Sequence, residues 1–175
     1  MRAYICAYAR KSRDLVMTTE ARLGPELCNC LAVRQAARHI TQFYDQCLAP
    51  SGLRTTQFSI LAQMKRLGLM TINALAAELV MDRTTLGRNI LPLQREGLIA
   101  VVKGKTDRRS KELRVTEAGA ERLRAAVKGW VEAQTRFEAV FGPDRTAELR
   151  ALLYAVSASD LGAANRNDVV SEARS

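Results

Sequence analysis

The stretch Thr71–Thr116 constrains the fold most, because two helix patterns, a turn and a hairpin pattern follow one another closely within it. Thr71 is a favourable cap for the first helix. The apolar face of that helix repeats at helical spacing and consists of Ile72, Leu75 and Leu79. Val80 and Met81 are expected to form the turn, and Asp82 is expected to cap the second helix.

The second helix is predicted to have one apolar face and one polar face. Its apolar residues recur four and three positions apart and are Leu86, Ile90 and Leu93. At about 100° per residue, three side chains point nearly the opposite way: Thr84, Arg88 and Arg95. Gly97 is expected to follow the end of the helix. Pro92 lies inside it and cannot bond the carbonyl of Arg88, so we expect a kink there.

A basic β-hairpin is predicted directly after this helix. Ile99–Val102 is apolar and largely β-branched, and Lys111–Val115 alternates, with Leu113 and Val115 facing inward. Cations dominate the connection and its flanks, against the single acid Asp107: Lys103, Lys105, Arg108, Arg109 and Lys111. A helix–turn–helix followed by such a hairpin is the winged arrangement. The chain is therefore expected to be mainly α-helical, with a small antiparallel β-hairpin as its wing.

Further helices are expected on both sides of this unit. Residues 27–48 and 54–66 read as helices before it, with 67–70 as a linker. A long apolar stripe follows Thr116 as its cap and contains Leu123, Val127, Trp130, Phe137 and Phe141. Gly142–Pro143 ends that helix, and the last one carries Leu149, Leu152, Leu153 and Val156. We expect residues 1–26 to be an N-terminal extension, 27–161 to form one domain, and 162–175 to be a polar tail.

The composition favours a polyanionic partner and argues against several other functions. The net charge is +9 and the isoelectric point is near 9.9. No run of about 18 apolar residues is present, so no membrane span is expected. The four cysteines and the single histidine, His39, match no disulfide framework or zinc motif. We expect reduced thiols in a cytoplasmic protein, no metal, no cofactor and no enzyme activity, since the chain has no glycine-rich phosphate loop.

Three strings stand in a characteristic order and spacing: DRTTLGRNILPLQREGLI at residues 82–99, DRR at 107–109 and VTEAG at 115–119. Together they resemble the MarR family of bacterial transcription regulators, over about residues 27–161. The resemblance implies a homodimer formed by the helices of 27–48 and 117–161, with a DNA-binding unit at about 54–116. A two-fold dimer would place two recognition helices in successive major grooves of a pseudo-palindromic operator, about 34 Å apart.

The candidate DNA contacts lie on the second helix and on the wing. On the helix they are Arg83, Thr84, Thr85, Arg88 and Asn89. Arg88 can donate two hydrogen bonds to guanine, and the threonines can reach phosphates or thymine methyls. On the wing the candidates are Lys103, Lys105, Arg108 and Arg109, and the resemblance implies that Arg109 is the tip contact. The resemblance also implies that Asp107 pairs with Arg83 or Arg108 and holds the wing in shape; the alternative is a solvated turn residue.

The resemblance further implies a repressor that a small aromatic or phenolic ligand releases from DNA. Four residues are candidates for lining its pocket, with ordinary core packing as the alternative: His39, Phe43, Tyr44 and Phe58. A second reading is a peroxide sensor, because Cys30 matches the reactive cysteine of sensing members. Those members carry tyrosines in the next helix, where this chain has Thr55 and Phe58. A remote third reading is a winged helix that binds protein, but such a module does not need so basic a hairpin.

Overall fold

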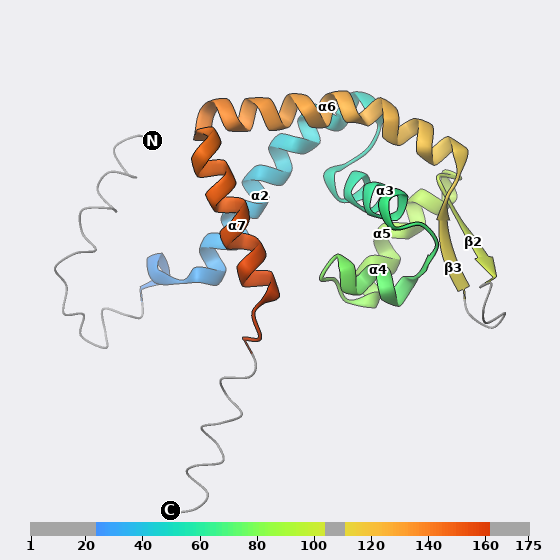
Figure 1. The fold of residues 1–175 in the computed structure, drawn as a ribbon, viewed down its shortest axis with the longest axis horizontal. Helices are drawn as coiled ribbons and strands as arrows, with labels where there is room; N and C mark the ends of the chain where they lie inside the picture. The colour runs from blue at the N-terminus through green and yellow to red at the C-terminus, as the bar shows by residue number, and fades with distance from the viewer. Residues whose placement is uncertain (1–23, 104–110, 162–175) are drawn as a thin grey trace, which may run out of the picture. The chain divides into compact units, whose positions relative to one another are not determined.

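The computed structural model describes residues 24–103 and 111–161 (Figure 1). Its elements, in chain order, are η2 (Pro25–Leu27), α2 (Asn29–Leu48), η3 (Ala49–Ser51), α3 (Thr55–Leu67), β1 (Met70–Thr71), α4 (Ile72–Glu78), α5 (Arg83–Arg95), β2 (Ile99–Lys103), β3 (Lys111–Val115), α6 (Glu117–Phe141) and α7 (Pro143–Ala158). The predicted fold class, mainly helical with a small antiparallel sheet, is confirmed. None of the described helices is long and apolar enough to cross a membrane.

The chain divides into two compact units, Met1–Gln42 and Phe43–Ser175, with the boundary inside α2. In the first unit the structure describes η2 and most of α2, whose side chains are largely exposed. The second unit contains the hydrophobic core, the sheet and the remaining helices. The domain bounds predicted from the sequence stay predictions.

Three predicted caps begin helices of the second unit. The Thr71 hydroxyl oxygen accepts a hydrogen bond from the N–H of Ala74 at 3.2 Å and so begins α4. The Asp82 carboxylate accepts from the N–H of Thr85 at 2.8 Å and begins α5. Thr116 caps α6 in the same way, accepting from the N–H of Gly119 at 3.1 Å. Each cap satisfies a backbone donor that the first helical turn leaves without a partner.

The core of this unit is built on the apolar face of α5. Leu86, Ile90 and Leu93 are buried, as predicted, whereas Thr84 and Arg88 on the opposite face are exposed. The α5 residues join one cluster with buried residues from the neighbouring elements, chief among them Ile60, Leu61, Met64, Leu75, Leu98, Ile99 and Leu113. Burial of these side chains therefore fixes which face of α5 points to solvent.

A complete C-capping motif ends α5. Gly97 has φ 71°, the left-handed conformation that glycine adopts without steric cost. The N–H of Leu98 donates to the carbonyl of Leu93 at 2.8 Å, and the N–H of Gly97 donates to Gln94 at 3.0 Å. These two bonds are the Schellman pattern, so the predicted role of Gly97 is confirmed. The helix continues through Pro92, and the kink expected there stays a prediction.

The sheet has three strands in the order β1–β3–β2, one more than predicted. The two strands of the hairpin pair antiparallel, with Ile99 opposite Val115. The additional strand β1 pairs with β3 and places Met70 opposite Leu113. Interpreting residues 67–70 only as a linker was therefore wrong, because a two-residue strand is too short to show the alternation that identifies strands in a sequence.

Asp45 of α2 stabilises the beginning of α3. One of its carboxylate oxygens accepts from both the N–H and the hydroxyl of Thr55, each at 2.7 Å. The other accepts from the Arg54 guanidinium at 3.3 Å. Burial alone would raise the pKa of Asp45, but the hydrogen bonds from Thr55 and Arg54 outweigh it and lower that pKa. The start of α3 is thus held by a charged group on α2.

The first turn of α6 is clamped to the end of α5. The Thr116 hydroxyl donates to the carbonyl of Gly97 at 2.7 Å, and its N–H donates to the carbonyl of Leu98 at 3.0 Å. A Cβ atom at Gly119 would collide with that same Leu98 carbonyl oxygen. The VTEAG string therefore combines a cap at position 116 with a close approach that only glycine permits at position 119.

Gly119→Ala should lower the free energy of unfolding by about 1–3 kcal/mol, because the added methyl meets backbone that cannot rotate away. Gly87→Ala is the matched control, since a Cβ there meets no atom within 4 Å. It should raise stability by about 0.5–1 kcal/mol, the usual gain for replacing glycine inside a helix. Urea unfolding of both variants measures the two effects. Equal changes in the two variants would contradict the proposed close approach.

Candidate nucleic-acid interface

The first two turns of α5 present the residues that the sequence singled out for DNA contact. The exposed ones are Arg83, Thr84, Thr85 and Arg88. Asn89 is half-buried, and its side-chain amide donates to the carbonyl of Thr85 at 2.9 Å. Asn89 therefore lies at the edge of the exposed face and already has one partner within the helix.

Asp82 shapes the N-terminal end of this face. Hydrogen bonds from the hydroxyl and the N–H of Thr85 lower the pKa of the Asp82 carboxyl. Because the carboxyl stays ionised at neutral pH, it complements the positive end of the helix dipole as well as capping it. The Thr85 hydroxyl thus already donates to the Asp82 carboxylate. Thr84 and Arg88 are the exposed side chains of this face that are available to contact a ligand.

The described part of the wing adds cations next to the sheet. Lys103 and Lys111 lie opposite each other in the β2–β3 register, and both are exposed. Arg114 of β3 is also exposed. It was not among the predicted contacts, although the alternation of Leu113 and Val115 already implied that it faces outward. The predicted contacts Lys105, Arg108 and Arg109, together with Asp107, lie outside the described residues.

A groove of about 670 Å³ lies between α3 and α6. Its lining residues are Phe58, Ser59, Ala62, Gln63, Lys65, Arg66, Leu79, Leu123, Val127 and Trp130. Phe58 and Trp130 stack with their ring centroids 6.1 Å apart and their planes 17° apart. Trp130 was predicted as part of an apolar stripe, yet 37% of its surface remains exposed. The groove is therefore lined by an aromatic pair and also by the cations Lys65 and Arg66.

The remaining predicted pocket residues lie elsewhere. Phe43 and Tyr44 form an edge-to-face pair with centroids 5.6 Å apart, and the Arg136 guanidinium lies 5.0 Å from the centre of the Phe43 ring. Burial raises the pKa of the Tyr44 hydroxyl. His39 is exposed and belongs to the first unit. Of the four predicted pocket residues, only Phe58 lines the groove.

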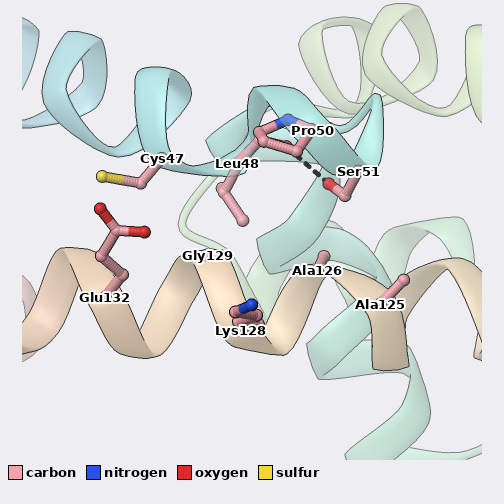
Figure 2. Close-up of a pocket in the computed structure, with 9 residues that line it drawn as sticks. All are labelled: Cys47, Leu48, Pro50, Ser51, Ala125, Ala126, Lys128, Gly129 and Glu132. Atoms are coloured by element: carbon pink, nitrogen blue, oxygen red, sulfur yellow. Dashed lines mark hydrogen bonds between the residues drawn. The ribbon is translucent and has the colours of Figure 1, made fainter.

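A smaller hollow of about 290 Å³ separates the end of α2 and η3 from α6 (Figure 2). Cys47 and Glu132 face each other across it, one from each side (Figure 2). Arg136 donates to the Glu132 carboxylate at 3.2 Å and to the Cys47 sulfur at 3.7 Å. A Cβ at Gly129 would collide with the carbonyl oxygen of Cys47, so these helices approach closely here. The contacts of this hollow are those of a helix–helix junction.

The described cysteines are free thiols. Cys28 and Cys30 are exposed, and Cys47 is buried. The N–H of Leu31 donates to the sulfur of Cys28 at 3.4 Å, which places that sulfur at the start of α2. Within residues 24–103 and 111–161, no group of histidine, cysteine and acidic side chains is arranged to hold a metal ion.

Known proteins share both the sequence pattern and the fold. A MarR family sequence model matches residues 53–111, while no curated protein matches the chain. The transcriptional regulator MosR of M. tuberculosis, solved in complex with DNA, is 38% identical with a TM-score of 0.65, over 77% of this chain and 99% of that one.

Two more distant structures share the fold. BpsR of Bordetella bronchiseptica, whose DNA binding is regulated by 6-hydroxynicotinic acid, gives a TM-score of 0.71 at 20% identity, over 78% of this chain and 98% of that one. Apo MarR of E. coli gives a TM-score of 0.61 at 18% identity, over 74% of this chain and 96% of that one. The identity to MosR, its near-complete coverage and the matched family model agree, and the chain belongs to the MarR family of transcription regulators.

Proposed function

We propose that the protein is a sequence-specific repressor that binds a pseudo-palindromic operator as a homodimer and leaves it when a small ligand binds. One observation carries this proposal: the buried face of α5 fixes its opposite face, with Arg83, Thr84 and Arg88, toward solvent. Polar and cationic side chains near the start of such a helix are those that recognition helices use on base edges. The relative MosR, solved in complex with DNA, supports the same partner here.

In this proposal the helix specifies sequence and the wing strengthens binding. Arg88 donates two hydrogen bonds to guanine in the major groove, and Thr84 and Thr85 contact phosphates or thymine methyls. The wing contributes Lys103, Lys105, Arg108 and Arg109 to the minor groove or its phosphates, with Asp107 holding its shape. The cations among these residues also attract DNA of any sequence, because the phosphate backbone is negatively charged. The net charge of +9 strengthens this attraction. The protein would meet DNA in the cytoplasm.

The proposed homodimer explains the apolar surface of α7. Leu152 and Val156 lie one helical turn apart, and 59% and 55% of their surfaces are exposed in the single chain. Leu153 beside them is also exposed. An apolar patch of this kind is typical of a surface that a partner covers. A second copy of the chain, related by a two-fold axis, would cover it and present a second α5 to the next major groove.

The proposed ligand site is the groove between α3 and α6. The stacked rings of Phe58 and Trp130 suit a small aromatic or phenolic ligand, and Lys65, which lines the same groove, can attract a negative group. Leu79, which follows α4, also lines the groove. A ligand there would touch the segment that leads into α5, so its binding can change the position of the recognition helix.

Arg88→Ala should weaken binding to the operator by about 1–3 kcal/mol and relax the preference at one base pair, because a bidentate contact to one base is lost. The operator is first obtained by selecting duplexes from a randomised pool with the wild-type protein. Titrations against every single-base variant of the selected duplex then give the preference at each position.

Arg124→Ala is the charge-matched control, since Arg124 is exposed on α6 and pairs with Glu117 at 3.0 Å. It should leave the base preferences unchanged. If Arg88→Ala weakens all duplexes equally, Arg88 contacts phosphate and does not read a base.

A second candidate function is a peroxide-sensing repressor, which the exposure of Cys30 near the start of α2 favours. We expect that stoichiometric organic peroxide will not release the protein from DNA. The reason is that Thr55 and Phe58 stand where the sensors that this chain resembles have tyrosines to activate the thiol. Cys30→Ser should bind the selected duplex normally in a gel-shift assay. Peroxide release of the wild type but not of Cys30→Ser would establish the sensor function instead.

A further inference from the structure

The turn between α4 and α5 contains an unusual backbone conformation. Val80 has φ 51°, and among the described residues it is the one non-glycine residue with positive φ. Its N–H donates to the carbonyl of Ala77 at 3.1 Å, and the N–H of Met81 donates to the carbonyl of Ala76 at 2.8 Å. These are the two hydrogen bonds of a Schellman motif, which lock Val80 in the left-handed conformation.

Where the chain requires only the left-handed conformation of a Schellman motif, it has a glycine, Gly97. It occupies the equivalent position at the end of α5, with φ 71° and the same pair of hydrogen bonds. Valine is among the residues least suited to this conformation, because its branched Cβ crowds the backbone when φ is positive. The chain thus carries at position 80 a side chain that the backbone disfavours.

Packing does not compensate for this cost. Leu79 and Met81, on either side, pack against the core, whereas the surface of Val80 is 74% exposed. The side chain therefore points away from the protein. Strained residues of this kind that persist without packing are concentrated where function requires them.

The position of Val80 indicates what its side chain contacts. It lies two residues before the Asp82 cap, next to the exposed first turn of α5 with Arg83 and Thr84. We propose that Val80 makes an apolar contact with the DNA duplex, either with a thymine C5 methyl group or with a deoxyribose. This inference rests on the proposed DNA binding. It adds an apolar contact to an interface whose other candidate residues are polar or cationic.

Three variants test the contact on the duplex selected by the wild-type protein. Val80→Gly removes both the side chain and the strain, Val80→Asn keeps a side chain that tolerates positive φ, and Val80→Ala keeps the Cβ but removes both methyl groups. Each should bind the duplex roughly three- to ten-fold more weakly, the effect of losing one or two buried methyl groups. Val80→Gly should also melt roughly 2 °C higher, at equal protein concentration.

Gly97→Val is the control for the stability cost of a valine with positive φ, because a Cβ there meets no atom within 4 Å. It should lower the melting temperature, and so measure the cost of placing valine in this motif at a position where a Cβ has open space. A variant that gains stability while it loses affinity cannot be explained by a merely structural role for Val80. If Val80→Gly binds the duplex as tightly as the wild type, or melts at a lower temperature, the inference is overturned.

Replacing thymidine by deoxyuridine, one position at a time, distinguishes the two sources of the contact. If Val80 contacts a thymine methyl group, deoxyuridine at one position should weaken binding of the wild type but not of Val80→Gly. A deoxyribose contact predicts the Val80→Gly defect without any such position. If the wild-type protein selects no duplex from the pool, DNA binding itself fails. A wild-type protein that selects a duplex, with variants that bind equally well, contradicts only the role of Val80.

Discussion

The arrangement of the second unit depends on the burial of one face of α5. Leu86 and Leu93 are fully removed from water and Ile90 nearly so, and each contributes about 1.5–3 kcal/mol to the stability of the fold. Because these residues share one side of the helix, the opposite side with Arg88 must face solvent. The exposure of the polar face of α5 thus follows from the burial of its apolar face.

Both ends of α5 are held by hydrogen bonds, and those at its C-terminal end connect the helix to α6. Asp82 begins the helix, and the motif around Gly97 ends it. Thr116 then joins that end to α6 through the carbonyls of Gly97 and Leu98. A displacement of α6 is therefore expected to reach α5 directly. The groove between α3 and α6 is lined by Leu123, Val127 and Trp130 of that same helix α6.

Several features of the fold were predictable because they depend on local chemistry. The caps at Thr71, Asp82 and Thr116 and the stripe on α5 each follow from residue type and spacing. The strand β1 was missed because two residues carry no periodicity. Trp130 lies on the predicted stripe, but its stacking on Phe58 joins residues distant in sequence. Likewise, the left-handed conformation of Val80 could not be predicted, since valine is not a residue that indicates it.

In the proposed complex, two copies of α5 read two half-sites of one duplex. Hydroxyl-radical footprinting of the wild-type protein on its selected duplex tests this most directly. We expect two protected patches with the same sequence in inverted orientation, with centres about 10 base pairs apart. A single patch, or protection that is the same on every sequence, would contradict it.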